Sequence, residues 1–118
     1  MPVEFLDPGD RIVTRGRGSA PLRALRIIGA PQSTFVTIPA RALGRGLPER
    51  DLDLHPAQIV LTHGRTARMF YGSDVAAIRA DRLTTRGGRN HPWMFQLVFD
   101  TPQTIFVEGV EIVMPGLF

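Results

Sequence analysis

Short apolar segments separated by glycine and proline dominate the hydrophobic pattern of this chain. Its 12 glycines and 10 prolines are scattered along 118 residues and leave uninterrupted pieces of mostly about five to ten residues, a length typical of β-strands. Helices of ordinary length have little room between such breaks. The pattern therefore predicts an all-β chain.

Most of these pieces are rich in β-branched and aromatic residues, which favour extended structure. The predicted strands are Arg11–Thr14, Leu22–Ile28, Thr34–Ile38, Leu52–Leu54, Gln58–Thr62, Ala67–Tyr71, Trp93–Asp100 and Thr104–Val113. Apolar side chains alternate from Trp93 to Phe99, so one face of that strand is strongly apolar. A tight turn at Asp100–Gln103 is predicted to join it to Thr104–Val113 in a C-terminal hairpin.

Ser73–Arg86 is the one long window without a break, and it permits two interpretations. It fits a helix capped by Ser73, and it also fits a strand at Val75–Ile78 followed by a turn. Gly16-x-Gly18 lacks the lysine and hydroxyl residue of a phosphate-binding loop and predicts a hairpin or surface loop. Short strands with turns between them predict a compact barrel-like or sandwich fold. We expect one domain over residues 1–118, because half of this length is too small to bury a core.

Charge changes the picture less than the isoelectric point suggests. The 14 basic residues are all arginines, so a net charge of only +3 gives a pI near 10.9, since almost nothing titrates between histidine and arginine. Residues 41–91 hold nine arginines against five acids, whereas residues 92–118 hold three acids and no arginine. The basic middle is either an anion-binding face or a set of solvated arginine loops, and we favour the second interpretation.

The chain contains no cysteine, which excludes disulfides, thiolate metal sites and cysteine nucleophiles within it. No apolar run approaches the length that crosses a bilayer. The first residues, MPVEFLDPGD, carry acids where a signal peptide carries bases. We therefore expect a cytoplasmic protein with no membrane contact and with Met1 as its true start.

Several segments, in a fixed order, resemble the bacterial Hedgehog/intein (Hint) domains. Val3–Thr14 (VEFLDPGDRIVT) resembles their VEDLxPGDxVxT stretch, and Pro21–Ile28 (PLRALRII) lies where they have a PVRWIG-like strand. Ile38–Leu61 resembles their IRAGALGxGLPxRDLxVSPxHxVL segment, and Met94–Gly109 resembles their YVHLLFDRHEVVFANG hairpin. The resemblance implies an all-β, horseshoe-like fold of long bent hairpins, and it favours strand plus turn for Val75–Leu83.

The resemblance also allows the self-processing chemistry of these domains to be checked. Their first residue, a Cys or Ser nucleophile, would lie upstream of Val3 and beyond Met1. Their T/S-x-x-H element reads His55-Pro56-Ala57-Gln58 here, so Gln58 occupies the position of the general acid, and glutamine does not titrate near neutral pH. An intein-like terminal Asn is absent, because the chain ends in Phe118. The resemblance thus implies no catalytic residue, no enzyme and a vestigial cleft around His55 and Gln58.

Our leading hypothesis is a degenerate, non-catalytic Hint-like module without a cofactor. Its partner would be another protein or a second copy of the chain. It predicts that His55 and Gln58 can each be replaced by alanine without loss of the fold.

One alternative is a nucleic-acid-binding protein. The best basic patch consists of Arg79, Arg82, Arg86 and Arg89, in and around a glycine-rich loop at residues 86–90. Only Trp93 lies near enough in the sequence to stack on a base, so the usual platform for single strands is missing.

A second alternative is a divergent metal-dependent hydrolase. Asp51, Asp53 and His55 share one face if this segment is a strand, and two carboxylates with an imidazole form a possible divalent-metal site. The other interpretation is the solvent face of a half-buried strand. We favour that interpretation and expect no metal.

Overall fold

The computed structural model describes residues 6–16, 18–29, 34–84, 86–90 and 93–116. The strands in this part of the chain are β1 (Arg11–Thr14), β2 (Gly18–Pro21), β3 (Ala24–Gly29), β4 (Thr34–Ile38), β5 (Leu52–Leu54), β6 (Ile59–His63), β7 (Val75–Arg79), β8 (Gly87–Asn90), β9 (Trp93–Val98), β10 (Gln103–Val107) and β11 (Val110–Met114). The helices are α1 (Gly64–Tyr71) and α2 (Ala80–Leu83).

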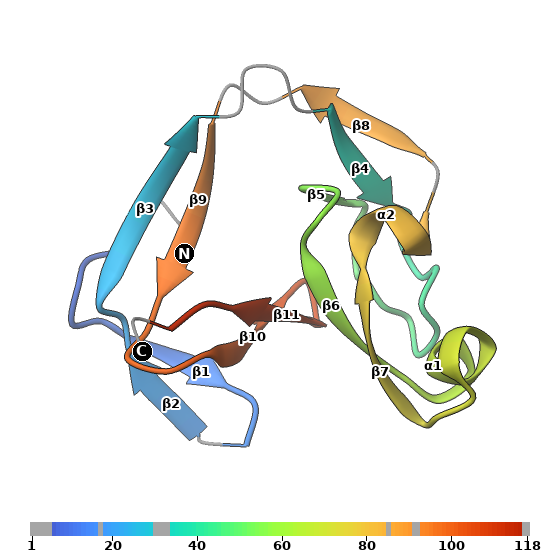
Figure 1. Cartoon of the computed structure of the whole chain (residues 1–118), viewed down its shortest axis with the longest axis horizontal. Helices are drawn as coiled ribbons and strands as arrows, with labels where there is room; N and C mark the ends of the chain where they lie inside the picture. Colours follow the sequence, from blue (N-terminus) through green and yellow to red (C-terminus); the bar gives the residue numbers. More distant parts are fainter. Residues whose placement is uncertain (1–5, 17, 30–33, 85, 91–92, 117–118) are drawn as a thin grey trace.

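Three sheets arrange these strands as a horseshoe (Figure 1). One arm is the two-stranded sheet β3-β9, and the base and part of the other arm belong to a six-stranded sheet ordered β2-β1-β10-β11-β6-β7. The second arm also holds the three-stranded sheet β5-β4-β8 and both helices. The predicted all-β class is confirmed, with two short helices added to it.

The six-stranded sheet is the main sheet of the fold. Alternating burial along β11 shows how the sequence builds it. Val110, Ile112 and Met114 are buried on the inner face, whereas Glu111 and Val113 lie on the outer face and are half-buried. This period of two is what a strand between a core and a solvated face requires. The register pairs Ile112 with Val60 of β6, so the inner face continues across the sheet.

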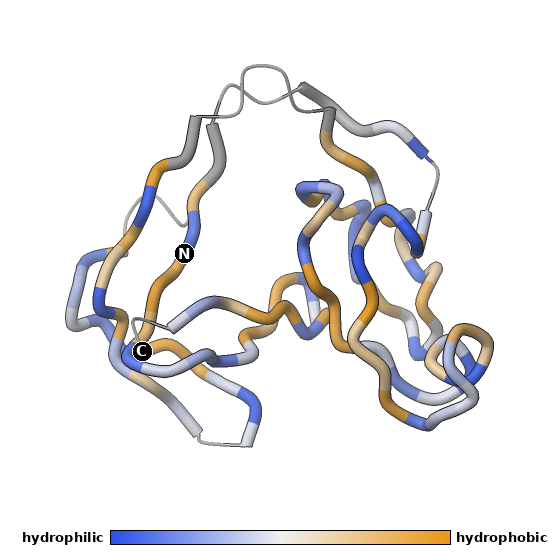
Figure 2. Tube along the Cα trace, viewed as in Figure 1, coloured by the Kyte–Doolittle hydropathy of each residue, from blue (hydrophilic) through white to orange (hydrophobic). Residues whose placement is uncertain are grey.

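The core lies on this inner face. Its buried members include residues of β2, β4, β5, β6, β9, β10 and β11, and Figure 2 shows the hydrophobic stretches of β6, β9, β10 and β11. The largest fully buried side chains include Phe99, Leu22 and Ile38. Each such side chain stabilises the fold by about 1.5–3 kcal/mol when it leaves water. Because the inner side chains of β10, β11 and β6 are buried in this core, the outer face of these strands is held in a fixed position.

Most strand predictions are confirmed. Those for β1, β4 and β5 coincide with the observed bounds. Those for β3 and β6 differ by one or two residues at each end, and that for β9 is two residues too long at its end. The turn at Gly16-x-Gly18 joins β1 to β2, so the predicted hairpin is present. For Ser73–Arg86 the strand with a following turn is right and the long helix is wrong, because β7 precedes the single turn α2.

The predicted C-terminal hairpin is wrong in its pairing. β9 pairs with β3, from Ala24 with Val98 to Gly29 with Trp93. The hairpin lies within the segment predicted as one strand, Thr104–Val113, because β10 and β11 pair around Glu108 and Gly109. Both turn residues have positive φ, 51° and 79°, which is the backbone of a two-residue hairpin whose twist matches its strands.

Two further predictions are wrong. Ala67–Tyr71 is not a strand but the last part of α1. The segment that was predicted as a flexible basic loop, residues 86–90, contains β8, which pairs with β4. That pairing joins residues about fifty positions apart, so no local pattern announces it.

Candidate functional site

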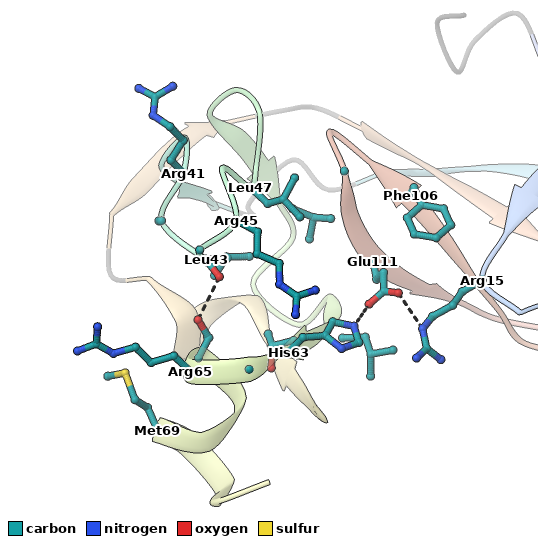
Figure 3. Close-up of a pocket in the computed structure, with 18 residues that line it drawn as sticks. Arg15, Arg41, Leu43, Arg45, Leu47, His63, Arg65, Met69, Phe106 and Glu111 are labelled. Carbon is teal, nitrogen blue, oxygen red and sulfur yellow. Dashed lines mark hydrogen bonds and ion pairs between the residues drawn. The ribbon is translucent and has the colours of Figure 1, made fainter. Parts of the chain in front are cut away.

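A pocket of about 830 Å³ lies on the outer side of the main sheet (Figure 3). Its walls are the 39–48 loop, the end of β6 with the start of α1, and the β10–β11 hairpin. Arg15, from the β1–β2 turn, completes the rim. Pockets of this size hold small ligands or anchor side chains of a partner.

The 39–48 loop is held in shape by its own backbone. Leu43 N–H donates to Leu47 O at 2.9 Å, and Arg41 N–H donates to Pro48 O at 2.8 Å. Thr66 Oγ1, on α1, donates to Leu43 O at 3.3 Å. Leu47 packs against Gly109 of the hairpin so closely that a Cβ at residue 109 would lie 2.5 Å from Leu47 Cδ2. The pocket wall is therefore tied to both neighbouring elements.

Glu111 forms the charged centre of the pocket floor. One carboxylate oxygen pairs with Arg15 Nε at 2.8 Å, and the other contacts His63 Nε2. The Glu111 side chain is only 11% exposed, and both of its oxygens are in contact with residues that line the pocket. Among the residues that the structure describes, Glu111 is the only acid that lines the pocket.

The rest of the lining is cationic and apolar. Figure 3 shows the Arg45 guanidinium pointing into the pocket towards His63, whereas Arg41 and Arg65 point outward from its rim. Leu47 and Phe106 lie on opposite sides of the pocket. A ligand that suits this lining has an anionic group beside an apolar one.

The predicted cleft residues lie away from this pocket, since neither His55 nor Gln58 lines it. The Gln58 side-chain amide donates to Ile59 O at 3.1 Å and to Val113 O at 2.9 Å. His55 Nδ1 accepts from Ala57 N–H at 3.1 Å. Both side chains therefore hold the turn before β6, and Gln58 also fastens that turn to β11.

Three arginines of the predicted nucleic-acid patch have partners on the protein. Arg79 makes a bidentate pair with Asp81, with contacts of 3.2 and 2.8 Å. These hydrogen bonds hold the pKa of Asp81 below its ordinary value and raise the pKa of Arg79. Arg82 Nη1 donates to Tyr71 Oη at 3.4 Å, and Arg86 pairs with Asp51 at 3.4 Å.

The fourth member of that patch is Arg89. Its backbone belongs to β8, and its side chain lies outside the described residues. Trp93, the one stacking candidate, begins β9, and its side chain also lies outside them.

The side chains weighed as a possible metal face, Asp51, Asp53 and His55, have partners within the protein. Asp51 Oδ1 accepts from Ala40 N–H at 2.8 Å, and Thr37 Oγ1 donates to Asp53 Oδ1 at 2.5 Å. The His55 ring lies edge-on to Phe35, with ring centroids 6.2 Å apart. Among the described residues, no three histidine, aspartate or glutamate side chains gather as metal ligands would.

Sequence reasoning missed the pocket residues. They come from separate places in the chain: Arg15, Arg45, His63, Phe106 and Glu111. Only the register of the main sheet and the path of the 39–48 loop bring them together. The loop itself had a signal, because its LGRGLP run was part of the family resemblance.

Comparisons with known proteins give one match. A family model described as a Hint domain matches residues 1–113. No curated protein and no solved structure matches the chain. Neither helix in the described part of the chain has the length and hydropathy to cross a bilayer.

Proposed function

Since the chain belongs to the Hint domain family, we propose that it is a Hint domain without self-processing chemistry which serves as a protein-binding module in the cytoplasm. The proposal treats the family fold as a scaffold that presents a surface, and it gives no residue a catalytic role. A protein partner or a second copy of the chain would occupy that surface.

The position of Gln58 carries this proposal. By resemblance, Gln58 stands where self-processing Hint domains have the histidine that protonates the leaving amide nitrogen. A general acid must release a proton near neutral pH, and a primary amide does not. Its N–H groups already donate to the carbonyls of Ile59 and Val113. Gln58 thus acts as a brace between β6 and β11.

These 118 residues contain no cysteine, so they supply no thiol nucleophile of their own. A covalent mechanism needs an activated nucleophile. The hydroxyl of Thr62, on β6, has a structural role, because Thr62 Oγ1 donates to Ala76 O at 2.9 Å.

The surface around the pocket supports a binding role. Phe106 is 47% exposed and Met69 is 75% exposed, and both line the pocket. Pairing of Thr14 with Ile105 places Val13, which is 65% exposed, beside Phe106 on the outer face. Exposed apolar side chains gathered around a pocket are typical of an interaction site.

Mass spectrometry of the intact chain tests the loss of self-processing. We expect the purified chain to keep its mass during long incubation with dithiothreitol or hydroxylamine, which cleave thioester and ester intermediates. A chain unfolded in urea is the control for cleavage that needs no structure. A fragment that accumulates only from the folded chain, and that one substitution abolishes, would overturn the proposal.

Capture from a native lysate at moderate and at high salt tests the binding role. We expect a discrete protein that saturates at a fixed stoichiometry, or self-association seen by analytical ultracentrifugation. Nucleic acid alone, removed by salt, would instead favour the arginine patch, because contacts to phosphate weaken steeply as salt rises.

A further inference from the structure

The pocket carries an uncompensated positive charge. Among the described residues, Arg41, Arg45 and Arg65 have no ion pair, although each lines the pocket. The single acid of the lining, Glu111, is already engaged by Arg15 and His63. Arg45, which points into the cavity (Figure 3), therefore has its charge available for a ligand.

The backbone adds an independent observation. Arg41 and Arg45 have positive φ, 65° and 56°, a conformation that disfavours a side chain by about 1 kcal/mol or more. The same loop uses Gly44 and Gly46 for its other left-handed positions, at φ 84° and 72°. Glycine would fit positions 41 and 45 without this strain. Arginines held in a strained conformation at a pocket point to a function of their side chains.

The apolar walls extend past the pocket on both sides. Leu47 and Phe106 lie on opposite sides of the cavity. Beyond Phe106 lies Val13, and Met69 stands on the α1 side. Methionine adapts to irregular partners. A ligand that covers these apolar side chains is longer than the cavity itself, which favours a chain of residues over a compact small molecule.

We infer that the pocket binds an acidic segment of a partner protein, in which a carboxylate is adjacent to a bulky apolar side chain. The carboxylate pairs with the Arg45 guanidinium, whose planar fork suits a bidentate contact. The apolar side chain lies between Leu47 and Phe106. This inference rests on the proposed binding function and names the chemistry of its partner.

Selection from a random heptapeptide library displayed on phage tests the inference. The whole chain is immobilised as the target. We expect the enriched peptides to share an Asp or Glu beside Leu, Ile, Phe or Met. Peptides without an acid in common would overturn the inference.

Arg45→Gly is the decisive variant, because it removes the charge and also relieves the left-handed strain. We expect it to fold at least as stably as the parent chain and to bind a fluorescein-labelled selected peptide at least about tenfold more weakly, as loss of a charged hydrogen-bonded pair implies. Arg26→Ala is the matched control. Arg26 is exposed on β3 and lies outside the pocket, so its loss should leave the affinity unchanged.

The outcomes separate the two proposals. Selected peptides that bind Arg45→Gly as well as the parent chain would overturn the pocket inference and leave the binding function standing. Failure to enrich any peptide would overturn the inference too, while lysate capture decides the binding function separately. Stronger binding of a random single-stranded DNA probe than of any peptide, lost in Arg45→Gly, would assign the pocket to phosphate and overturn the inference.

Discussion

Gln58 joins the start of β6 to β11 through its side-chain amide. One hydrogen bond reaches the neighbouring carbonyl of Ile59, and the other crosses to Val113, 55 residues away. An alanine at this position leaves the partly buried Val113 carbonyl without this donor. A single intramolecular hydrogen bond contributes about 0.5–1.5 kcal/mol net.

We therefore expect Gln58→Ala to keep the fold and to lower the free energy of unfolding by about 1–2 kcal/mol. Urea denaturation followed by circular dichroism measures the change. His55→Ala is the comparison, because His55 Nδ1 hydrogen-bonds only within the same turn, to Ala57 N–H, and the ring makes one edge-on contact with Phe35. It should lose less. Equal stability of Gln58→Ala and the parent chain would contradict the bracing role.

Asp81 neutralises Arg79, a member of the predicted nucleic-acid patch. Hydrogen bonds from Arg79 lower the pKa of Asp81 in the folded chain. A carboxyl whose folded pKa lies below its unfolded value stabilises the native state above the unfolded pKa, and this contribution is lost as pH falls through the folded pKa. The contribution is thus present at neutral pH and disappears in acid.

Arg79→Ala should raise the pKa of Asp81 towards its ordinary value. A carboxyl ¹³C titration by NMR measures the midpoint directly. Arg68→Ala is a suitable control, because Arg68 pairs with Asp74 instead and its loss should leave Asp81 unchanged. An unaltered Asp81 midpoint in Arg79→Ala would show that the pair does not persist in solution.

Helix α1 explains why one element was predicted wrongly. As a strand, Ala67–Tyr71 would place Ala67, Met69 and Tyr71 on one face. As a helix it buries Ala67 and half-buries Phe70 against β7, and Met69 and Tyr71 are 75% and 55% exposed. The signal for a helix is the spacing of three between the apolar residues Ala67 and Phe70. Gly72 follows and ends the helix with φ 67°. Aromatic content favoured the strand and outweighed that signal.

The β10–β11 hairpin was predictable in part. Its alternating apolar residues announced extended structure, and Glu108-Gly109 is a turn signal of the same kind as Asp-Gly. The pairing of β9 with β3 was not predictable locally, because it joins residues about seventy positions apart. The pocket was not predictable locally either, because its walls meet only after such long-range pairings form.

Gly109 allows a test of the contact between the hairpin and the 39–48 loop. Gly16 and Gly109 both have φ of 79°, but a Cβ meets nothing within 4 Å at Gly16 and lies 2.5 Å from Leu47 Cδ2 at Gly109. Each change to alanine should lower the free energy of unfolding by about 1–2 kcal/mol through strain. Only Gly109→Ala should displace Leu47.

Methyl NMR spectra of the two variants separate strain from contact. We expect the Leu47 methyl signals to shift strongly in Gly109→Ala and to stay in place in Gly16→Ala. Unperturbed Leu47 methyls in Gly109→Ala would show that this pocket wall does not rest on the hairpin.

The β3–β9 arm and the six-stranded sheet of the horseshoe differ in how much they bury. The six-stranded sheet supplies Val60, Ile105, Val110, Ile112 and Met114 to the core. The β3–β9 arm is a sheet of only two strands, and a ribbon of two strands is marginal unless it packs against other elements.

Among the described side chains of the β3–β9 arm, the buried ones lie at one end. Leu97 and Val98 are buried near its base, whereas further along β3 Arg26 is exposed and Ile27 is 66% exposed. Backbone hydrogen bonds in such a segment open at a lower free energy than those of the core.

Native-state hydrogen exchange should therefore show two levels of protection. We expect the amides of β3 that pair with β9 to exchange through local opening, at a free energy well below that of global unfolding. The amides of β6, β10 and β11 should exchange only when the chain unfolds, because their strands are central in the sheet and carry the core. Low concentrations of denaturant distinguish the two classes of amide. Local opening exposes little surface, so its free energy changes little with denaturant. Uniform protection of the β3–β9 arm and the main sheet would mean that the horseshoe unfolds as one unit, and the pocket on the outer face of the main sheet would then share its stability with the β3–β9 arm.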